Sequence, residues 1–405
     1  MSFQSSIVNR KSSIVRGLTW AEIDLRALVE NYRALSALLE SPSVSATQPP
    51  IVNRQSSIVN RLIPVIKADA YGHGAVPVAR ALLGAGAQIL AVGMVEEGIA
   101  LRDAGIPAEI LVLGGAWPGQ EREALRCRLT PAIHSSEGVA RLERAARETE
   151  AQVRVHLNLD TGMSRLGIPW DGMDPVLEAL AKTTRLVLAG TLSHLACAEE
   201  EDPSFTQEQI RRFHHVVARL EARGLNPGEL HLANSAGLLF HAELRAHSAR
   251  PGIALYGYAP APARCPIALQ PSLSLKSTVC QIHTLSPGTS VGYNRLFVAP
   301  RVTRAATLPI GYADGYRRSL AGKANAIVRD RKVPVLGSVN MDMIVIDVTD
   351  VADVREGDEV ILLGSSAGCR IDAAAWAELL GTNPYEILCG IGPRVPRIYL
   401  GEEIR

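Results

Sequence analysis

Eight short runs of β-branched and aliphatic residues, separated by segments of helical periodicity, fill residues 62–258. Eight such strands with interleaved helices over about 200 residues are typical of a closed (β/α)8 barrel. No G-x-G-x-x-G sequence follows the first run, which argues against a Rossmann nucleotide site. We therefore expect a barrel of the TIM type. The expected strands are Leu62–Lys67, Ile89–Met94, Ile110–Leu113, Leu129–His134, Val153–Leu159, Leu186–His194, Glu229–Leu232 and Ile253–Tyr256. The expected helices are Val76–Leu83, Glu96–Ala104, Gln120–Arg126, Ser136–Glu150, Asp174–Lys182, Phe205–Arg223 and Ser235–Phe240.

After about Gln270 the pattern changes to Val, Thr and Ile alternation broken by Pro-Gly and Gly-Asp turns, as in TLSPGTSVGY and REGDEVILLG. This pattern predicts a separate β-rich C-terminal domain over 272–405, with one helix, Ala373–Leu380, before a final strand, Val395–Leu400. The barrel domain is expected over 18–271, led by a strand at Leu18–Asp24 and a helix at Leu25–Leu39. Residues 1–17 form a polar extension.

The charge balance excludes several classes of partner. Lysine and arginine number 42 against 41 acidic residues, so the formal net charge is +1 and neither nucleic acid nor a membrane surface is an expected partner. No apolar run approaches the ~18 residues of a membrane span, and the opening MSFQSSIVNR lacks a signal core, which favours a cytoplasmic protein. The six cysteines form no C-x-x-C pair, which predicts reduced, mostly buried thiols without disulfides or a metal site.

A short polar repeat interrupts the chain near its start. The sequence QSSIVNR at Gln4–Arg10 recurs with small changes at Lys11–Arg16, Gln48–Arg54 and Gln55–Arg61. Because only the adjacent Ile and Val are apolar, the copies cannot form a coiled-coil seam. We interpret the copies at about 41–61 as a loop insertion, and we expect deletion of Gln48–Asn60 to leave stability and activity unchanged.

Polar residues just past the strands are the candidate active-site residues, because barrel enzymes react at the carboxyl ends of their strands. Lys67 ends the first strand and is followed by ADAYGHG. Partial desolvation would lower the pKa of Lys67 toward the amine form that attacks carbonyls, although such a lysine can also simply reach solvent. Ser235 is a candidate helix cap beside an anion site. Without a functional role, His194 could be a core histidine bonded to a backbone carbonyl, and Arg250 could form a salt bridge at the rim of the barrel.

Eight sequence blocks together resemble the alanine racemase family. They are VIKADAYGHG, LNLDTGMSRLG, TLSHLACAEE, HLANSAG, RPGIALYG, LPIGYADGYRR, GSVNMDM and TNPYEILCGIGPRVPRIY, and they span about Thr19 to Arg405 apart from the insertion. The resemblance implies an enzyme that uses pyridoxal 5′-phosphate (PLP) to interconvert L- and D-alanine for peptidoglycan. It also implies a homodimer whose sites are shared between subunits.

The resemblance assigns cofactor contacts to particular residues. Lys67 would hold PLP as an imine, and Arg250 would face the pyridine nitrogen. Because a guanidinium only donates, that nitrogen would stay largely unprotonated, which favours racemisation over transamination. The residues matched to the phosphate are Tyr71, Ser235, Gly252, Ile253 and Tyr385.

Racemisation needs a base on each face of the substrate carbanion. The resemblance assigns one face to Lys67 and the other to Tyr312 of GYADG, which would reach the barrel of a second subunit and connect through His194 to Arg250. Arg165 and the backbone of Met341 match the groups that hold the substrate carboxylate.

Two positions depart from the family pattern. Asn158 stands where many relatives have a lysine that is often carbamylated, so we expect a chloride-sized anion between Asn158 and Arg165, or an altered hydrogen-bond network. Asn340 precedes Met341 where a cysteine is frequent, which affects the expected substrate selectivity.

Three alternatives remain open on the sequence. A broad-specificity racemase usually carries a signal peptide, which the opening residues do not resemble. A barrel-type PLP decarboxylase would not explain GYADG together with NMDM. A non-enzymatic PLP-carrier protein would lack the β-rich domain.

Overall fold

The computed structural model describes residues 17–41 and 61–401. The chain divides into two compact units. The barrel unit comprises Val29–Ala70 and Ala75–Leu269, and the C-terminal unit comprises 17–28, Tyr71–Gly74 and 270–401 within the described ranges. The repeat copies lie outside the described residues, apart from Arg61.

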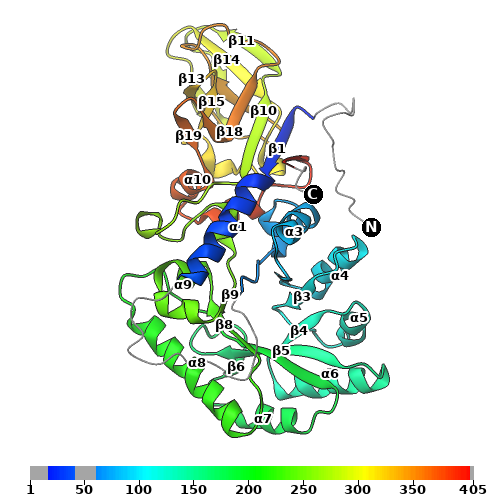
Figure 1. The fold of residues 1–405 in the computed structure, drawn as a ribbon. Coiled ribbons are helices and arrows are strands. Elements are labelled where there is room, and N and C mark those ends of the chain that lie inside the picture. The colour runs from blue at the N-terminus through cyan, green and yellow to red at the C-terminus, as the bar shows by residue number, and fades with distance from the viewer. Residues whose placement is uncertain (1–16, 42–60, 402–405) are drawn as a thin grey trace. The chain divides into compact units, whose positions relative to one another are not determined.

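A parallel sheet forms the barrel unit, which confirms the predicted fold class (Figure 1). Its strands, in spatial order, are β2 (Ile89–Val92), β3 (Glu109–Val112), β4 (Thr130–Ile133), β5 (Val153–Asp160), β7 (Leu186–Leu192), β8 (Glu229–Ala233) and β9 (Ser248–Ala249). A short strand, β6 (Ile168–Pro169), pairs with β5. The segment before Lys67 joins the two ends of this sheet through parallel bridges from Leu62 to Ala249 and from Val65 to Ala91.

Helices follow the strands close to their predicted bounds. They are α3 (Ala75–Gly84), α4 (Val95–Asp103), α5 (Glu121–Arg126), α6 (Ser136–Glu148), α7 (Asp174–Ala181), α8 (Ser204–Ala222) and α9 (Ser235–Phe240). Their apolar faces are buried; on α8, for example, Phe213 and Leu220 are fully covered. The strand residues of β2 and β4 are also fully buried, as expected for a sheet covered on both faces.

The predicted eighth strand is wrong. Residues Ile253–Tyr256 form a 3-10 helix, and the strand that closes the sheet is β9, Ser248–Ala249. Pro251 and Gly252 interrupt the extended backbone, and the short helix ends at Gly257 with φ of 92°. All four side chains of the 3-10 helix are buried, which is why their apolar run resembles a buried strand.

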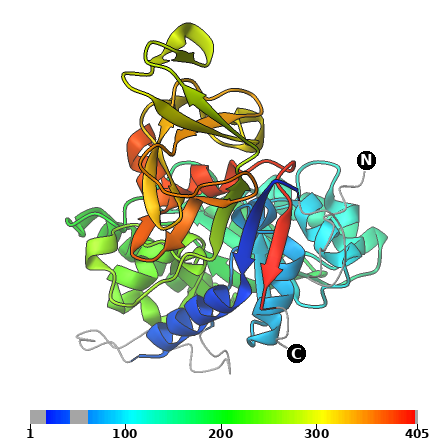
Figure 2. The same ribbon diagram turned by 90° about the horizontal axis from the view of Figure 1, so that it is seen from above.

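The C-terminal unit contains an extended, mostly antiparallel sheet. Its strand order is β11 (Gln281–Leu285), β14 (Thr303–Leu308), β17 (Ile344–Asp347), β16 (Arg331–Leu336), β15 (Asn325–Val328), β18 (Glu359–Ser366), β10 (Leu273–Thr278), β1 (Thr19–Asp24) and β20 (Arg397–Leu400). Strand β1 pairs antiparallel with β10 and parallel with β20, and Figure 2 shows β1 in blue beside β20 in red. The first strand of the chain therefore completes the sheet of the C-terminal unit. The helix after it, α1, spans Leu25–Glu40.

Two helices lie near the end of the chain. Helix α10 occupies the predicted residues, Ala373–Leu380, and is capped by Asp372, whose carboxylate accepts from the backbone N–H of Ala375. Helix α11 (Pro384–Cys389) was not predicted, although Asn383 caps it and proline occupies its first position. Only Ile387 and Leu388 of this helix are buried, and two adjacent apolar residues give no helical periodicity.

The predicted burial of the cysteines is only partly correct. All six are free thiols, but Cys127 alone is buried and Cys389 is exposed. Among the described residues, no helix is long and apolar enough to cross a membrane.

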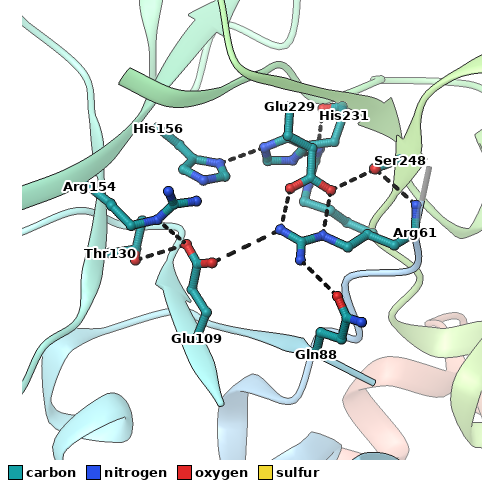
Figure 3. A network of polar contacts seen from close by, with 10 residues as sticks. Arg61, Gln88, Glu109, Thr130, Arg154, His156, Glu229, His231 and Ser248 are labelled. Atoms are coloured by element: carbon teal, nitrogen blue, oxygen red, sulfur yellow. Dashed lines mark hydrogen bonds and ion pairs between the residues drawn. The ribbon is translucent and has the colours of Figure 1, made fainter. Parts of the chain in front are cut away.

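A buried carboxylate fixes the entry to the first barrel segment (Figure 3). The side chain of Glu229 is 3% exposed and receives two bonds from Arg61, Nε to Oε1 at 2.9 Å and Nη2 to Oε2 at 2.7 Å. The Ser248 hydroxyl donates to the same carboxylate at 2.6 Å and accepts from the backbone N–H of Arg61 at 3.1 Å. The last residue of the repeat therefore anchors β8 and β9.

We predict that Arg61→Met lowers the free energy of unfolding by on the order of 3 kcal/mol, because it removes one partner of a buried ion pair and leaves the Glu229 carboxylate without its cation. The matched control is Arg122→Met, since the Arg122–Glu148 pair is largely exposed and should cost under about 1 kcal/mol. Urea denaturation measures both. Deleting Gln55–Arg61 brings Arg54 next to Leu62 and should preserve stability. Equal small losses for the two arginine variants would contradict the role of Arg61.

Candidate active site

Lys67 begins a short turn with left-handed backbone conformation. Its successors Ala68, Asp69, Ala70 and Tyr71 have φ between 52° and 54°. Residues with a side chain rarely adopt this region, and each costs about 1–2 kcal/mol there. Strain of this kind persists only where surrounding contacts impose it, and it clusters at functional sites. The turn therefore marks the end of the first barrel segment as a candidate active site.

Glu97, on α4, holds the start of this turn. Its Oε1 accepts from the backbone N–H of Ala68 at 2.6 Å, and its Oε2 accepts from those of Gly93 at 2.7 Å and Met94 at 3.1 Å. Gly93 packs closely on Glu97, because an added Cβ would lie 3.3 Å from Oε2 of Glu97, whereas the stem of Lys67 would be in ordinary contact at 3.6 Å. Glu97 was not among the residues predicted from the sequence. Its signal was weak, since acidic residues in a first helical turn usually serve only the helix.

Arg250 is a buried cation that no carboxylate neutralises among the described residues. The side chain donates from Nη1 to Nδ1 of His231 at 2.9 Å and to the carbonyl of His231, and from Nη2 to the carbonyl of Ser193. Arg250 is 4% exposed, and burial lowers the pKa of its guanidinium to about 10. It is therefore a core residue held by neutral acceptors, which excludes the rim salt bridge.

Positive charge converges around His194. Burial, followed by the charges of Arg250, Arg165 and Lys67, lowers the pKa of His194 to about 3, so its imidazole is neutral at physiological pH. These four predicted residues are therefore close enough to interact electrostatically within the barrel unit. No hydrogen bond joins the His194 ring to Arg250 among the described residues. A region with three cations suits an anionic ligand.

Ser235 does not cap α9, which corrects the sequence interpretation. The cap is Asn234, whose Oδ1 accepts from the backbone N–H of Gly237 at 2.9 Å. The Ser235 hydroxyl instead accepts from the backbone N–H groups of Gly252 at 3.0 Å and Ala254 at 3.3 Å. Asn234 caps the helix, so the Ser235 hydroxyl is not needed for the cap. It lies instead beside the N–H groups near Ile253, and this buried cluster could bind a small anion.

Asn158 contacts a histidine that the sequence analysis did not identify. Its Nδ2 bonds to Nδ1 of His134 at 3.1 Å and to the carbonyl of Leu166 at 3.5 Å. Burial lowers the pKa of His134 to about 4. Because this imidazole is neutral, its Nδ1 can accept the amide hydrogen. Asn158 is buried, whereas Arg165 is exposed.

Tyr312 and Met341 lie together in the C-terminal unit. The backbone N–H of Tyr312 donates to the carbonyl of Asn340 and that of Ala313 to the carbonyl of Met341, each at 3.0 Å. Close contact requires glycine at 311, because a Cβ there would lie 2.2 Å from the carbonyl oxygen of Met341. The side chains of Tyr312 and Met341 are 43% and 52% exposed.

The remaining predicted residues also belong to the C-terminal unit. The ring centroids of Tyr71 and Tyr385 are 5.9 Å apart. Tyr71 is buried and Tyr385 is 38% exposed. The structure thus brings together Tyr71 with Tyr385 and Tyr312 with Met341 in this unit. The barrel unit contains the other predicted residues as separate sets: Lys67, Arg165 and Arg250 around His194, Ser235 with Gly252 and Ile253, and Asn158 with His134.

The fold and the site define a class of protein. A parallel barrel with a lysine at the end of its first segment, a positively charged interior and a buried hydroxyl and N–H cluster is typical of barrel enzymes that hold a phosphorylated cofactor on a lysine.

Comparisons with known proteins identify the family. Residues 51–260 match the family model described as alanine racemase, N-terminal domain, and 272–399 match alanine racemase, C-terminal domain. The chain belongs to the alanine racemase family. It is 42% identical over 385 residues to alanine racemase of Symbiobacterium thermophilum, which covers 95% of this chain and 97% of that protein.

Solved structures of alanine racemases have a fold similar to that of this chain. Alanine racemase from Bacillus anthracis with bound L-Ala-P has a TM-score of 0.84 and 33% identity, with 96% of each chain covered. Alanine racemase from Bartonella henselae with covalently bound pyridoxal phosphate has a TM-score of 0.82 and 29% identity, with 94% of this chain and 99% of that one covered.

Proposed function

We propose that this chain racemises alanine with PLP bound at Lys67 and with Lys67 and Tyr312 as the two bases. The observation that carries the assignment is the position of Lys67, which starts a strained turn held by Glu97 beside the charges that surround His194. D-alanine from this reaction would supply peptidoglycan synthesis. Family membership and the near full-length relatives support the activity.

The residues present fit PLP. The hydroxyl of Ser235 and the N–H groups of Gly252 and Ala254 are buried and converge, which suits a phosphate. Ile253 lies between those N–H groups, and we propose that Tyr71 and Tyr385 complete the phosphate contacts. PLP supplies a conjugated ring that withdraws electrons from the substrate Cα. Arg250 would donate to the ring nitrogen and leave it unprotonated, because a guanidinium does not release its proton.

The chain's own residues move the protons. We propose that Lys67 takes or returns the Cα proton on one face and Tyr312 on the other, since one base tends to return the proton to the face it left. The neutral His194 would accept a hydrogen bond from the tyrosine. Arg165 and the backbone N–H of Met341 would hold the substrate carboxylate.

The two bases belong to different units, and Tyr312 is exposed on the C-terminal unit. We therefore propose a homodimer in which Tyr312 of one subunit serves the Lys67 site of the other. The β-rich C-terminal unit opposes the PLP-carrier alternative, which would lack it. A broad-specificity racemase remains the second candidate, and a panel of L-amino acids including serine and lysine distinguishes it.

Subunit complementation tests this proposal. Lys67→Ala and Tyr312→Phe chains should each be inactive in forming D-alanine, and a mixture after subunit exchange should recover roughly a quarter of wild-type activity. Random assortment makes half of the dimers mixed, and each mixed dimer has one intact site. A mixture of Lys67→Ala with the Lys67→Ala, Tyr312→Phe double variant is the control and should stay inactive. No recovery after verified exchange would place both bases in one chain.

We also propose a chloride-sized anion beside Arg165, in place of a carbamylated lysine. Both Nδ2 hydrogens of Asn158 already have protein acceptors, so the anion would rely on Arg165 and replace the longer contact to Leu166. We predict that activity rises with chloride beyond any effect of ionic strength, measured against a bulky, weakly coordinating anion at equal ionic strength. The anion site is contradicted if the rates in chloride and in the weakly coordinating anion are equal and if Asn158→Ala responds to the two salts as the wild type does.

A further inference from the structure

Arg250 begins a hydrogen-bonded chain that crosses the barrel interior. Its Nη1 lies 2.9 Å from Nδ1 of His231, and Nε2 of His231 lies 2.7 Å from Nδ1 of His156. Figure 3 shows the two imidazoles between β5 and β8, next to the Arg61–Glu229 pair. Both histidines are fully buried. Aliphatic side chains normally fill such a barrel interior, so this polar chain requires an explanation.

The direction of every hydrogen bond in the chain follows from Arg250. A guanidinium has donors and no acceptor, so Nδ1 of His231 must be unprotonated. The neutral ring of His231 then carries its hydrogen on Nε2 and donates it to Nδ1 of His156. His156 in turn carries its hydrogen on Nε2. The reverse direction would place two N–H groups against each other between Arg250 and His231.

Both rings stay neutral because of their surroundings. Burial, followed by the charges of Arg154, Arg61 and Arg250, lowers the pKa of His156 to about 3. Burial and the charge of Arg250 lower the pKa of His231 far below its ordinary value. A cationic His231 would lose its lone pair on Nδ1 and could not accept from Arg250.

Burying the ring of His156 lowers the stability of the fold. Nε2 of His156 has no hydrogen-bond partner among the described residues, which leaves a buried donor unsatisfied. Gly190, in β7, makes room for the ring, because a Cβ there would lie 2.6 Å from Nδ1 of His156. Its φ is not positive, so space rather than backbone conformation accounts for glycine at this position.

We propose that His156 is a positioning residue that reinforces the tautomer of His231 required by Arg250 and thereby helps to hold Arg250 as a donor toward the cofactor ring nitrogen. This inference rests on the proposed role of Arg250. His156 acts at a distance: it accepts from Nε2 of His231, which keeps the lone pair of Nδ1 directed at Arg250. Without that acceptor, the tautomer with hydrogen on Nε2 loses one buried hydrogen bond. Its advantage over the tautomer with hydrogen on Nδ1, whose N–H opposes the guanidinium, becomes smaller.

Reaction specificity should follow from this arrangement. With Arg250 in place, the ring nitrogen would stay unprotonated, and Lys67 or Tyr312 would return the proton to the substrate carbon. If Arg250 shifts, more of the proton should return to the cofactor carbon, so that the cofactor keeps the amino group and pyruvate leaves. This side reaction consumes one alanine and one cofactor aldehyde and needs no other oxidant or reductant.

The test compares His156→Leu, which removes the acceptor, with His156→Asn, whose Oδ1 can accept near the position of Nδ1. In holoenzyme containing nitrogen-15-labelled histidine, NMR should show His231 protonated on Nε2 only, its signals assigned by their loss in His231→Gln. We expect His156→Leu to populate the other tautomer and to raise pyruvate formed per racemisation about tenfold, the scale of one buried hydrogen bond. In His156→Asn, the tautomer of His231 and the amount of pyruvate formed per racemisation should both stay close to the wild-type values.

The control is His247→Leu. His247 is also buried and neutral, but it packs on His214 and does not belong to the hydrogen-bonded chain from Arg250 to His156. This variant should change neither readout. The proposal is overturned if wild-type His231 carries hydrogen on Nδ1, or if His156→Leu and His156→Asn give the same result. If His156→Leu does not fold, the proposal is still tested by the tautomer of His231 in the wild type and by both readouts in His156→Asn. Failure of the wild type to racemise alanine would overturn the proposed function and leave the tautomer measurement valid.

Discussion

The buried positive charge of Arg250 is the constraint on which the barrel interior depends. A guanidinium removed from water and without a carboxylate is costly unless acceptors surround it. Here the acceptors are the carbonyls of His231 and Ser193 and the ring of His231. A carboxylate would have been a stronger partner. It would also have neutralised the charge that lowers the pKa of His194. Neutral acceptors leave that charge available to the site.

The residues proposed to bind the cofactor and the substrate differ in chemistry between the two units. The barrel unit provides Lys67, the cationic residues and the cluster at Ser235, all at or beyond the carboxyl ends of its strands. The C-terminal unit provides hydroxyl groups, since Tyr71, Tyr312 and Tyr385 all belong to it. Tyr71 follows Lys67 by only four residues, so the strained turn is also the point where the chain leaves one unit for the other.

Much of the fold could be predicted because periodicity and turn residues agree with it. Helices α9 and α10 begin and end at the predicted residues, where a capping residue coincides with an apolar face. The segment Ile253–Tyr256 failed because four buried apolar residues look alike in a strand and in a 3-10 helix. The site residues followed from eight sequence blocks. Glu97, His134 and His156 did not, because their importance lies in hydrogen bonds to groups distant in sequence, which no local pattern reports.

Lys67, at the start of the strained turn, is the residue proposed to hold the cofactor. Borohydride reduction of the purified holoenzyme, followed by peptide mapping of the pyridoxyl group by mass spectrometry, tests this directly. We expect a single label on Lys67, within the peptide that contains ADAYGHG. A label on Lys182, Lys276 or any other lysine, with Lys67 unmodified, would contradict it.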